Sequence, residues 1–192
     1  LYTRTWIRMI ELVFWPTVEL MVWGFLGGFL YQNAGDEIGY IVGWLIGGMI
    51  LWDVLFRAQQ GVAISFLEDV WTNNLLNVFV APIRQREYLA ATFGVGLLRI
   101  CITVTVISVL AAVAYRFNVF VLDWYLLPFF ANLMVFGWAL GMISTALILR
   151  WGQAAEALAW AVPFFIQPIA CVFYPVAQLP GWLQVTAKAL PC

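Results

Sequence analysis

Five apolar runs, separated by polar, glycine-containing or proline-containing breaks, constrain most strongly what this chain can fold into. A bilayer needs roughly 20 apolar residues for one helical crossing, and a segment surrounded by lipid must satisfy its own backbone hydrogen bonds. The runs therefore predict an all-α integral membrane protein with five transmembrane helices and no β-sheet. These helices are expected near residues 17–32, 39–56, 94–115, 124–149 and 156–174.

The composition agrees with that class, because 65% of the residues are hydrophobic and only 10% are charged, whereas a soluble domain carries roughly 25% charged residues. The formal net charge is −1 and no basic cluster is present, so the chain lacks the surface that neutralises nucleic-acid phosphates. Histidine and the GxSxG motif are absent, and the cysteines show no CxxC spacing, which argues against a zinc site and a catalytic triad. We therefore expect no nucleic-acid partner, metal, cofactor or enzymatic activity.

Residues 1–15 have the pattern of an amphipathic helix that lies in the headgroup plane of a membrane. Apolar side chains follow one helical stripe and charged side chains the other face, as in interfacial helices. Pro16 comes next, and a proline inside a helix removes a hydrogen bond and bends the chain. The sequence therefore predicts an interfacial N-terminal helix, a change of direction at Pro16 and then the first span.

The interval over residues 57–93 is the only long stretch that cannot sit in hydrocarbon. Within it Ser65 precedes Glu68 by three residues, which is the spacing of a capping box at a helix start. Apolar residues then recur at helical spacing before Pro82 ends the element. We therefore expect a short amphipathic helix over residues 65–78, outside the membrane between spans two and three.

Lysine and arginine are distributed unequally between the two sides of the predicted spans. If the 65–78 helix is cytoplasmic, that side carries six arginines, whereas the outer loops carry only Arg116 and Lys188, in agreement with the positive-inside rule. The acidic residues Asp36 and Glu37 then lie outside. The six cytoplasmic arginines are Arg4, Arg8, Arg57, Arg84, Arg86 and Arg150.

The segment from Tyr174 to Leu190 is too short to cross a membrane and too apolar to leave it. We expect a re-entrant outer hairpin, which is tolerated where protein or water covers the backbone. Five spans that start from a cytoplasmic amino terminus leave the carboxyl terminus outside. We therefore expect the native chain to continue past Cys192 with a sixth span, and residues 1–192 to form one transmembrane domain.

Glu19 and Arg99 are charged residues inside predicted spans, where an unpaired charge costs about 2.5 to 3.5 kcal/mol at the bilayer centre. Glu19 either faces a pathway or a neighbouring helix, or it lies at headgroup level in a tilted helix. Arg99 poses the same question, and its side chain can also extend to the cytoplasmic surface. Asp53 can pair with Arg57 four residues later on the same helix.

Small residues recur at every fourth position in two of the predicted spans. Such rows either line a pore or let two helices approach closely, and close packing is their usual role. Tryptophan and tyrosine near span ends fit interfacial belts better than ligand contacts. The rows are Gly39, Gly43, Gly47 and Gly137, Gly141, Thr145, and the belt candidates are Tyr31, Tyr40, Trp52, Trp124 and Trp151.

Two patches of the sequence resemble a known family. The first is SFLEDVWTNNLLN at 65–77, followed by API at 81–83 and EY at 87–88; the second is PIACVFYP at 168–175 with LPGWL at 179–183. With this order of helices, the chain resembles the membrane subunits, or permeases, of bacterial ABC exporters of the second type. It departs from that pattern at Ala170-Cys171, where a Ser-Gly-like pair is expected.

The resemblance implies a permease of the bacterial cytoplasmic (inner) membrane that exports a substrate when a separate ATP-binding subunit hydrolyses ATP. It further implies that two permease copies pair among membrane lipids, and that a cytoplasmic coupling helix docks the ATP-binding subunit. Glu19 and Arg99 are then candidates for pathway or interhelical contacts. The alternative is a membrane scaffold or assembly subunit without a transport pathway. The residues expected to carry the docking are Ser65, Phe66, Leu67, Glu68, Asp69, Val70, Trp71 and Leu75.

Overall fold

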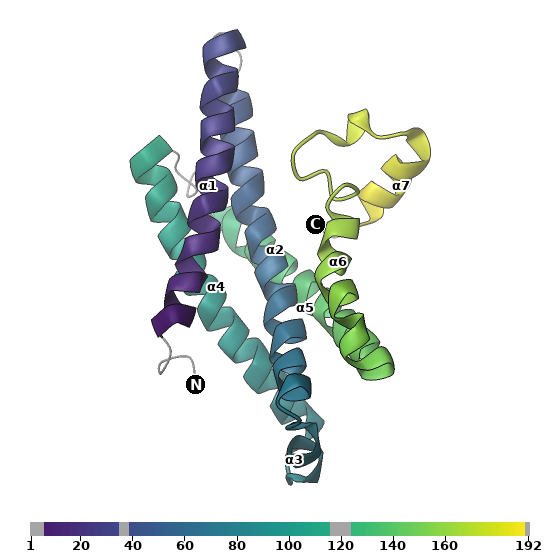
Figure 1. Ribbon diagram of the computed structural model, residues 1–192. Helices are drawn as coiled ribbons and strands as arrows, with labels where there is room; N and C mark the ends of the chain where they lie inside the picture. Colours follow the sequence, from purple (N-terminus) through teal and green to yellow (C-terminus); the bar gives the residue numbers. More distant parts are fainter. Residues whose placement is uncertain (1–5, 35–38, 116–123, 191–192) are drawn as a thin grey trace.

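The structure, a computed structural model, describes residues 6–34, 39–115 and 124–190. These residues are helical with irregular connections and contain no strand, so the all-α prediction is confirmed for this part of the chain. Helix α2 packs against α5, α4 and α1 (Figure 1). The elements are α1 (Trp6–Ala34), α2 (Gly39–Trp71), α3 (Leu75–Val80), α4 (Gln85–Tyr115), α5 (Leu126–Trp151), the 3-10 turn η4 (Gly152–Ala155), α6 (Glu156–Ile166), the 3-10 turn η5 (Val176–Gln178) and α7 (Gly181–Ala189).

Within the described residues, α4 and α5 are the helices that are long and apolar enough to cross a membrane. They contain most of the predicted spans at 94–115 and 124–149, and α4 begins earlier than expected, at Gln85. In α1 the apolar part is the shorter stretch Val13–Phe29. Length and composition thus support two of the five predicted spans directly, and the other three stay predictions.

The expected interfacial helix and the first span are not separated at Pro16, because α1 runs without interruption from Trp6 to Ala34. Pro16 is buried inside this helix, and Thr17 Oγ1 donates a hydrogen bond to the Val13 carbonyl oxygen at 2.7 Å. Apolar helices tolerate proline where neighbouring groups satisfy the freed carbonyl, here that of residue 12; the Thr17 hydroxyl bonds the next carbonyl, that of Val13. The described part of the expected interfacial helix and the first span therefore belong to one helix.

The prediction that a new helix begins at Ser65 is also wrong. Helix α2 continues through this position for 33 residues, a length of about 50 Å at 1.5 Å per residue. The Ser65 hydroxyl donates to the Gly61 carbonyl oxygen at 2.6 Å and does not cap a helix start. Residues 57–64 contain no proline, and one interior glycine costs only about 1 kcal/mol, so no local signal stops the helix.

Helix α2 ends in a Schellman motif. Asn73 has a φ of 53°, the left-handed conformation that asparagine adopts more readily than most residues. Its N–H donates to the Val70 carbonyl oxygen at 3.1 Å, and the Asn74 N–H donates to the Asp69 carbonyl oxygen at 2.9 Å. These are the two hydrogen bonds of the motif, and the short helix α3 follows directly.

Helix α4 begins with part of the capping arrangement that we predicted at Ser65. The Glu87 carboxylate accepts a hydrogen bond from the Arg84 backbone N–H at 3.0 Å. This is the half of a capping box that the third residue of a helix supplies. The chain thus returns to a helix soon after Pro82, with its start at Gln85.

Gly137 and Gly141 bring α5 into direct contact with α2. A Cβ atom at Gly137 would lie 2.6 Å from the Leu55 carbonyl oxygen, and one at Gly141 would lie 2.7 Å from the Val62 Cβ. Real Cβ atoms do not approach other atoms this closely. The packing interpretation is therefore confirmed for this pair of glycines, as expected for small residues between membrane helices.

Helix α6 is shorter than the predicted fifth span. It covers Glu156–Ile166 and includes Pro163. Its 11 residues extend about 16 Å at 1.5 Å per residue, roughly half of a hydrocarbon core. The helix ends before Pro168, since proline disfavours a helical conformation in the residue that precedes it. The predicted range 156–174 is therefore wrong in its second half.

Gln59 on α2 compensates for the hydrogen bond that Pro163 removes from α6. The Ala159 carbonyl oxygen lies four residues before Pro163, which has no N–H to donate. Gln59 Nε2 donates to this oxygen at 3.0 Å and to Ser144 Oγ at 2.8 Å. Gln59 and Ser144 are fully buried, so one side chain of α2 connects α5 and α6 inside the protein.

Replacing Gln59 with leucine should lower the free energy of unfolding by about 1 to 3 kcal/mol, the cost of a buried acceptor without a donor. The acceptor left behind is the Ala159 carbonyl oxygen. Thermal unfolding of the purified protein in detergent measures the change. In a Pro163→Ala background the backbone N–H of residue 163 can donate to the Ala159 carbonyl oxygen. Gln59→Leu should therefore lower the free energy of unfolding by less in that background. An equal cost in both backgrounds contradicts this role for Gln59.

The chain between α6 and α7 forms an irregular hairpin, drawn in yellow-green to yellow in Figure 1 and placed away from α3. Cys171 has a φ of 54°, which lies in the region that favours glycine. This position belongs to the pair where a Ser-Gly-like sequence is expected, so the backbone adopts the glycine conformation with another residue. The Tyr174 hydroxyl donates to the Pro168 carbonyl oxygen. The predicted position of the hairpin in a membrane stays a prediction.

Candidate functional site

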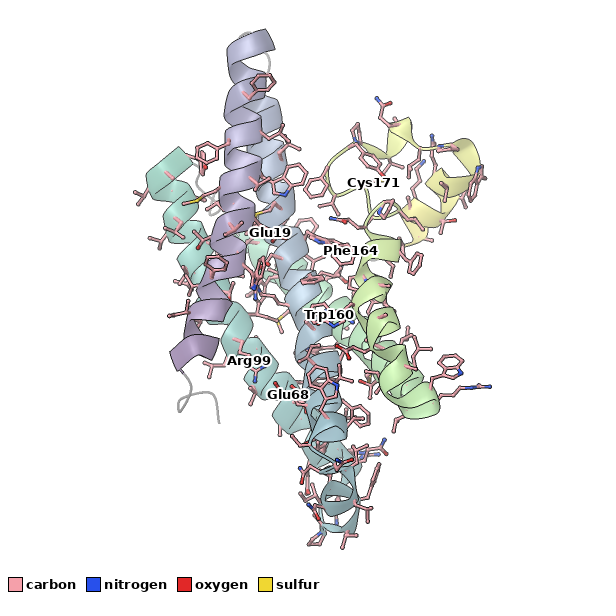
Figure 2. The ribbon with its side chains drawn as sticks, viewed as in Figure 1. Glu19, Glu68, Arg99, Trp160, Phe164 and Cys171 are labelled. Atoms are coloured by element: carbon pink, nitrogen blue, oxygen red, sulfur yellow. The ribbon has the colours of Figure 1, made fainter. Side chains whose placement is uncertain are left out.

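A cavity of about 660 Å³ lies between α1, α2, α4 and α6. Helix α2 supplies the largest share of its wall. Wall residues such as Asp53, Arg57, Ile64 and Glu68 lie four or seven residues apart, a spacing that places them on one face of the helix. Figure 2 labels one wall residue from each helix: Glu19 on α1, Glu68 on α2, Arg99 on α4 and Trp160 on α6.

The cavity wall carries charges of both signs. Arg57 Nε donates to Asp53 Oδ2 at 2.7 Å, so the predicted pair four residues apart is confirmed. The Asp53 side chain is only 2% exposed and that of Arg57 is 19% exposed. Glu19 interacts electrostatically with both residues. Ionisable groups inside an apolar helical protein are costly and mark functional sites, and here they surround one cavity.

Gln60 adds an unsatisfied polar group to the same wall. Both polar atoms of its side chain are buried and have no hydrogen-bond partner in the described part of the chain. A buried amide without partners costs about 1 to 3 kcal/mol, and such groups are rare in folded proteins. Because Gln60 lines the cavity, a bound molecule or water can supply the missing hydrogen bonds.

The two residues predicted as pathway or interhelical groups, Glu19 and Arg99, line this one cavity. They come from α1 and α4, which are separate in the sequence. Glu19 is exposed and Arg99 is half-buried. Their shared location favours a role in the cavity over two unrelated surface positions, and their use in transport stays a prediction.

Residues 71–83, which we call the tip, form one end of the molecule around α3 (Figure 1). The tip exposes large apolar side chains, and no residue of α3 is buried. Most of these residues were not among those predicted to dock a partner, although apolar neighbours inside a polar interval were a visible signal. The exposed fractions are 44% for Trp71, 76% for Leu76, 73% for Phe79, 77% for Val80 and 53% for Ile83.

Of the eight residues predicted to dock a partner, only Trp71 is exposed. Phe66 and Leu67 are buried in a cluster that includes Ile148 of α5 and Ala159 of α6, so they cannot contact a soluble partner in this fold. The helical periodicity did not indicate which face points outward, nor the break between α2 and α3 that interrupts the predicted helix over residues 65–78. The others are half-buried: Ser65, Glu68, Asp69, Val70 and Leu75.

Asp69 connects the tip to α4. Its Oδ2 accepts a hydrogen bond from the Tyr88 hydroxyl at 2.8 Å, and its Oδ1 accepts one from Asn74 Nδ2 at 3.1 Å. We expected Asp69 in the first turn of a helix, but it lies in the last turn of α2, where the helix dipole disfavours a negative charge. The hydrogen bonds from Tyr88 and Asn74 offset that cost and fix the position of α3.

The sequence matches a family described as "ABC-2 type transporter" over residues 2–192, nearly the whole chain. No curated protein and no solved structure matches it. The matched region includes both the cavity and the tip.

Proposed function

The chain belongs to the ABC-2 type transporter family, and from this premise we propose that it is the permease subunit of an ATP-driven exporter. Membership makes it a multi-pass membrane subunit of an ABC transporter. The proposal adds the direction of transport, a separate ATP-binding subunit that carries the hydrolysis, and the surface that binds this subunit.

The continuity of α2 carries the proposal. Asp53 and Arg57 of α2 line the cavity, and the same helix ends at Trp71 in the exposed tip. Asp69 bonds the tip to the start of α4 through Tyr88. Since helices transmit displacement as stiff elements, a soluble partner that moves the tip also moves the cavity wall. This supports a subunit in which ATP-driven motion of a partner changes the cavity.

We propose that the cavity forms part of the substrate pathway, with Glu19 and Arg99 in its wall. A second permease copy, identical or related, pairs with this one among membrane lipids. Helix α1 supports such a contact because it exposes large apolar side chains along its length. Their exposed fractions are 52% for Phe14, 59% for Trp15, 71% for Phe25 and 62% for Phe29.

In the proposed orientation the tip lies in the bacterial cytoplasm, beneath the inner membrane that the apolar helices cross. The end of α5 lies toward the same end of the molecule as α3 (Figure 1), so Arg84, Arg86 and Arg150 fall on one side. This agrees with the positive-inside rule. The hairpin would then face the outer side.

Replacing Phe79 with alanine should weaken capture of the ATP-binding subunit by about 1 to 4 kcal/mol, roughly fivefold to a thousandfold, if Phe79 is a buried anchor of the interface. Phe79 is 73% exposed in this chain, so its truncation should not affect permease folding. The measurement is a titration of the ATP-binding subunit against the full-length permease in nanodiscs. Trp71→Ala is a second test variant.

The matched control is Phe165→Ala, which truncates an equally exposed ring on α6, 72% exposed, and should leave capture unchanged. Undiminished capture by both Phe79→Ala and Trp71→Ala contradicts docking at the tip. The alternative of a scaffold without a pathway predicts that substitutions in the cavity wall leave ATP turnover by the complex unchanged.

A further inference from the structure

A second, smaller pocket of about 50 Å³ lies between α1, α2, the end of α6 and the hairpin. It shares Glu19, Asp53 and Phe56 with the larger cavity. Its wall differs from that of the larger cavity: it combines two carboxylates with five aromatic side chains, and no lysine or arginine of the described ranges lines it. The aromatic residues are Trp23, Trp52, Phe56, Phe164 and Phe173.

Helical spacing brings these groups together. On α2 the wall residues Met49, Trp52, Asp53 and Phe56 follow the spacing of three and four residues that places side chains on one face. On α1, Glu19 and Trp23 do the same. Trp52 is only 9% exposed, so its predicted position in an interfacial belt is wrong.

Two contacts between aromatic rings join α1 and α2 to the part of the pocket wall that the hairpin and α6 supply. Trp23 of α1 stacks on Phe173 of the hairpin, with 4.2 Å between ring centroids. Phe56 of α2 packs on Phe164 of α6 at 5.7 Å, with the rings tilted by 57°. Figure 2 labels Glu19 and Phe164, which lie on separate helices. The pocket is therefore assembled from segments that are distant in the sequence.

The chemistry of this wall favours a cation that carries apolar groups. The faces of aromatic rings are electronegative and attract ammonium groups, and several rings around one site form the known cage for methylated ammonium ligands. Carboxylates add attraction for a cation and repel anions. Arg57 pairs with Asp53 and also interacts electrostatically with Glu19. Its guanidinium belongs to the wall of the larger cavity, so the Glu19 carboxylate is the main anionic group that the small pocket offers to a cation.

The size of the pocket agrees with that guest. A water molecule needs about 10 to 15 Å³ of such volume, so the pocket of about 50 Å³ admits a small head group but not a whole organic molecule. A larger molecule can extend from the pocket into the 660 Å³ cavity, because the two share part of their walls.

We propose that the pocket formed by Glu19, Asp53 and the five aromatic residues binds the ammonium group of an organic cation, such as a methylated amine of the choline type. The residues proposed to recognise the cation all belong to this chain, so cation binding does not require the ATP-binding subunit. Its assignment as the transported substrate rests on the proposed function.

The test measures equilibrium binding of radiolabelled choline to the full-length permease, without any ATP-binding subunit. The nanodiscs contain only phosphatidylglycerol, whose headgroup has no ammonium group. Competition with 3,3-dimethylbutan-1-ol, the neutral carbon isostere of choline, separates recognition of charge from burial of apolar groups. We expect unlabelled choline and tetramethylammonium to displace the label, and the neutral alcohol to fail at the same concentrations.

Two variants locate the binding. Phe164→Leu keeps an apolar side chain but removes a ring, and it should weaken choline binding about five- to thirtyfold. Glu19→Gln removes a charge at constant size and should weaken it about ten- to a hundredfold. The matched controls are Phe165→Leu on the same helix and Glu156→Gln, since neither residue lines the pocket; both should bind like the unmodified protein. Melting curves verify that every variant is folded.

Equal displacement by choline and its neutral isostere overturns the proposal, as does unchanged binding in folded Phe164→Leu and Glu19→Gln. Nanodiscs that also contain phosphatidylcholine identify the source of the ammonium group. Loss of choline binding there points to a lipid headgroup, whereas unchanged binding points to a small solute, and both results support ammonium recognition. Failure of partner capture with intact choline binding contradicts the proposed function alone.

Discussion

Replacing both Gly137 and Gly141 with alanine is expected to destabilise the protein more than any other pair of single-methyl insertions considered in this chain. Each new Cβ would lie within 3 Å of α2, against the Leu55 carbonyl oxygen and the Val62 Cβ respectively. These are backbone and Cβ atoms, which cannot turn away as the end of a flexible side chain can. Overpacking of this kind costs about 1 to 3 kcal/mol per site, and the higher helix propensity of alanine returns about 1 kcal/mol.

The measurement is thermal unfolding in detergent of each single variant and of the double variant. Because the glycines are one turn apart, one displacement of α5 relieves both contacts, so the double variant should lose less than the sum. Gly94→Ala is the matched control, since a Cβ there meets nothing within 4 Å, and it should be neutral or stabilising. Unchanged melting of the double variant contradicts the close packing of α2 and α5.

The second large effect is expected from Asp53→Ala, which removes the carboxylate that Arg57 binds at 2.7 Å. Breaking a buried ion pair costs about 3 to 5 kcal/mol, because the remaining charge is left without its partner. We expect a loss near 3 kcal/mol, at the lower end of that range, since the Arg57 side chain retains 19% exposure and Glu19 interacts with it electrostatically.

Removing both charges tests the cause of that loss. The double variant Asp53→Ala/Arg57→Met should be more stable than Asp53→Ala alone, because no unpaired guanidinium remains. Adding Glu19→Gln to Asp53→Ala should destabilise further, since it removes the second carboxylate that acts on Arg57. Chemical denaturation in detergent measures all of these variants. A double variant no more stable than Asp53→Ala shows that lost packing, rather than charge, dominates.

The fold class and the positions of α4 and α5 followed from the apolar runs, since length and hydropathy are properties of a continuous stretch. The start of α1 at Trp6 and the end of α2 at Trp71 did not. Pro16 and the Ser65–Glu68 spacing are local signals, and neither marks a helix boundary, because α1 and α2 continue through them. Local signals fix a helix end only where no tertiary contact opposes them, as at Arg84, where the Glu87 contact forms.

The candidate sites also differ in how far the sequence alone could predict them. The Asp53–Arg57 pair was predictable because its spacing lies within one helix. The aromatic pocket was not, because it requires Trp23 and Phe173, which are distant in the sequence, to stack on each other. Trp52 was misplaced for that reason: a tryptophan near the end of an apolar run has the same local pattern whether it faces lipid or a pocket.

The unbroken course of α2 makes the two proposed binding events thermodynamically linked. Helix α2 carries Trp52 and Asp53 in the pocket wall and Trp71 at its end. If an occupied pocket and a bound partner favour different tilts of this helix, each lowers the affinity for the other; if they favour the same tilt, each raises it. The factor must be identical in both directions, typically about 5- to 150-fold. Binding of a cation in the pocket therefore changes the affinity for the ATP-binding subunit at the other end of the helix. Binding of the subunit changes the affinity for the cation by the same factor.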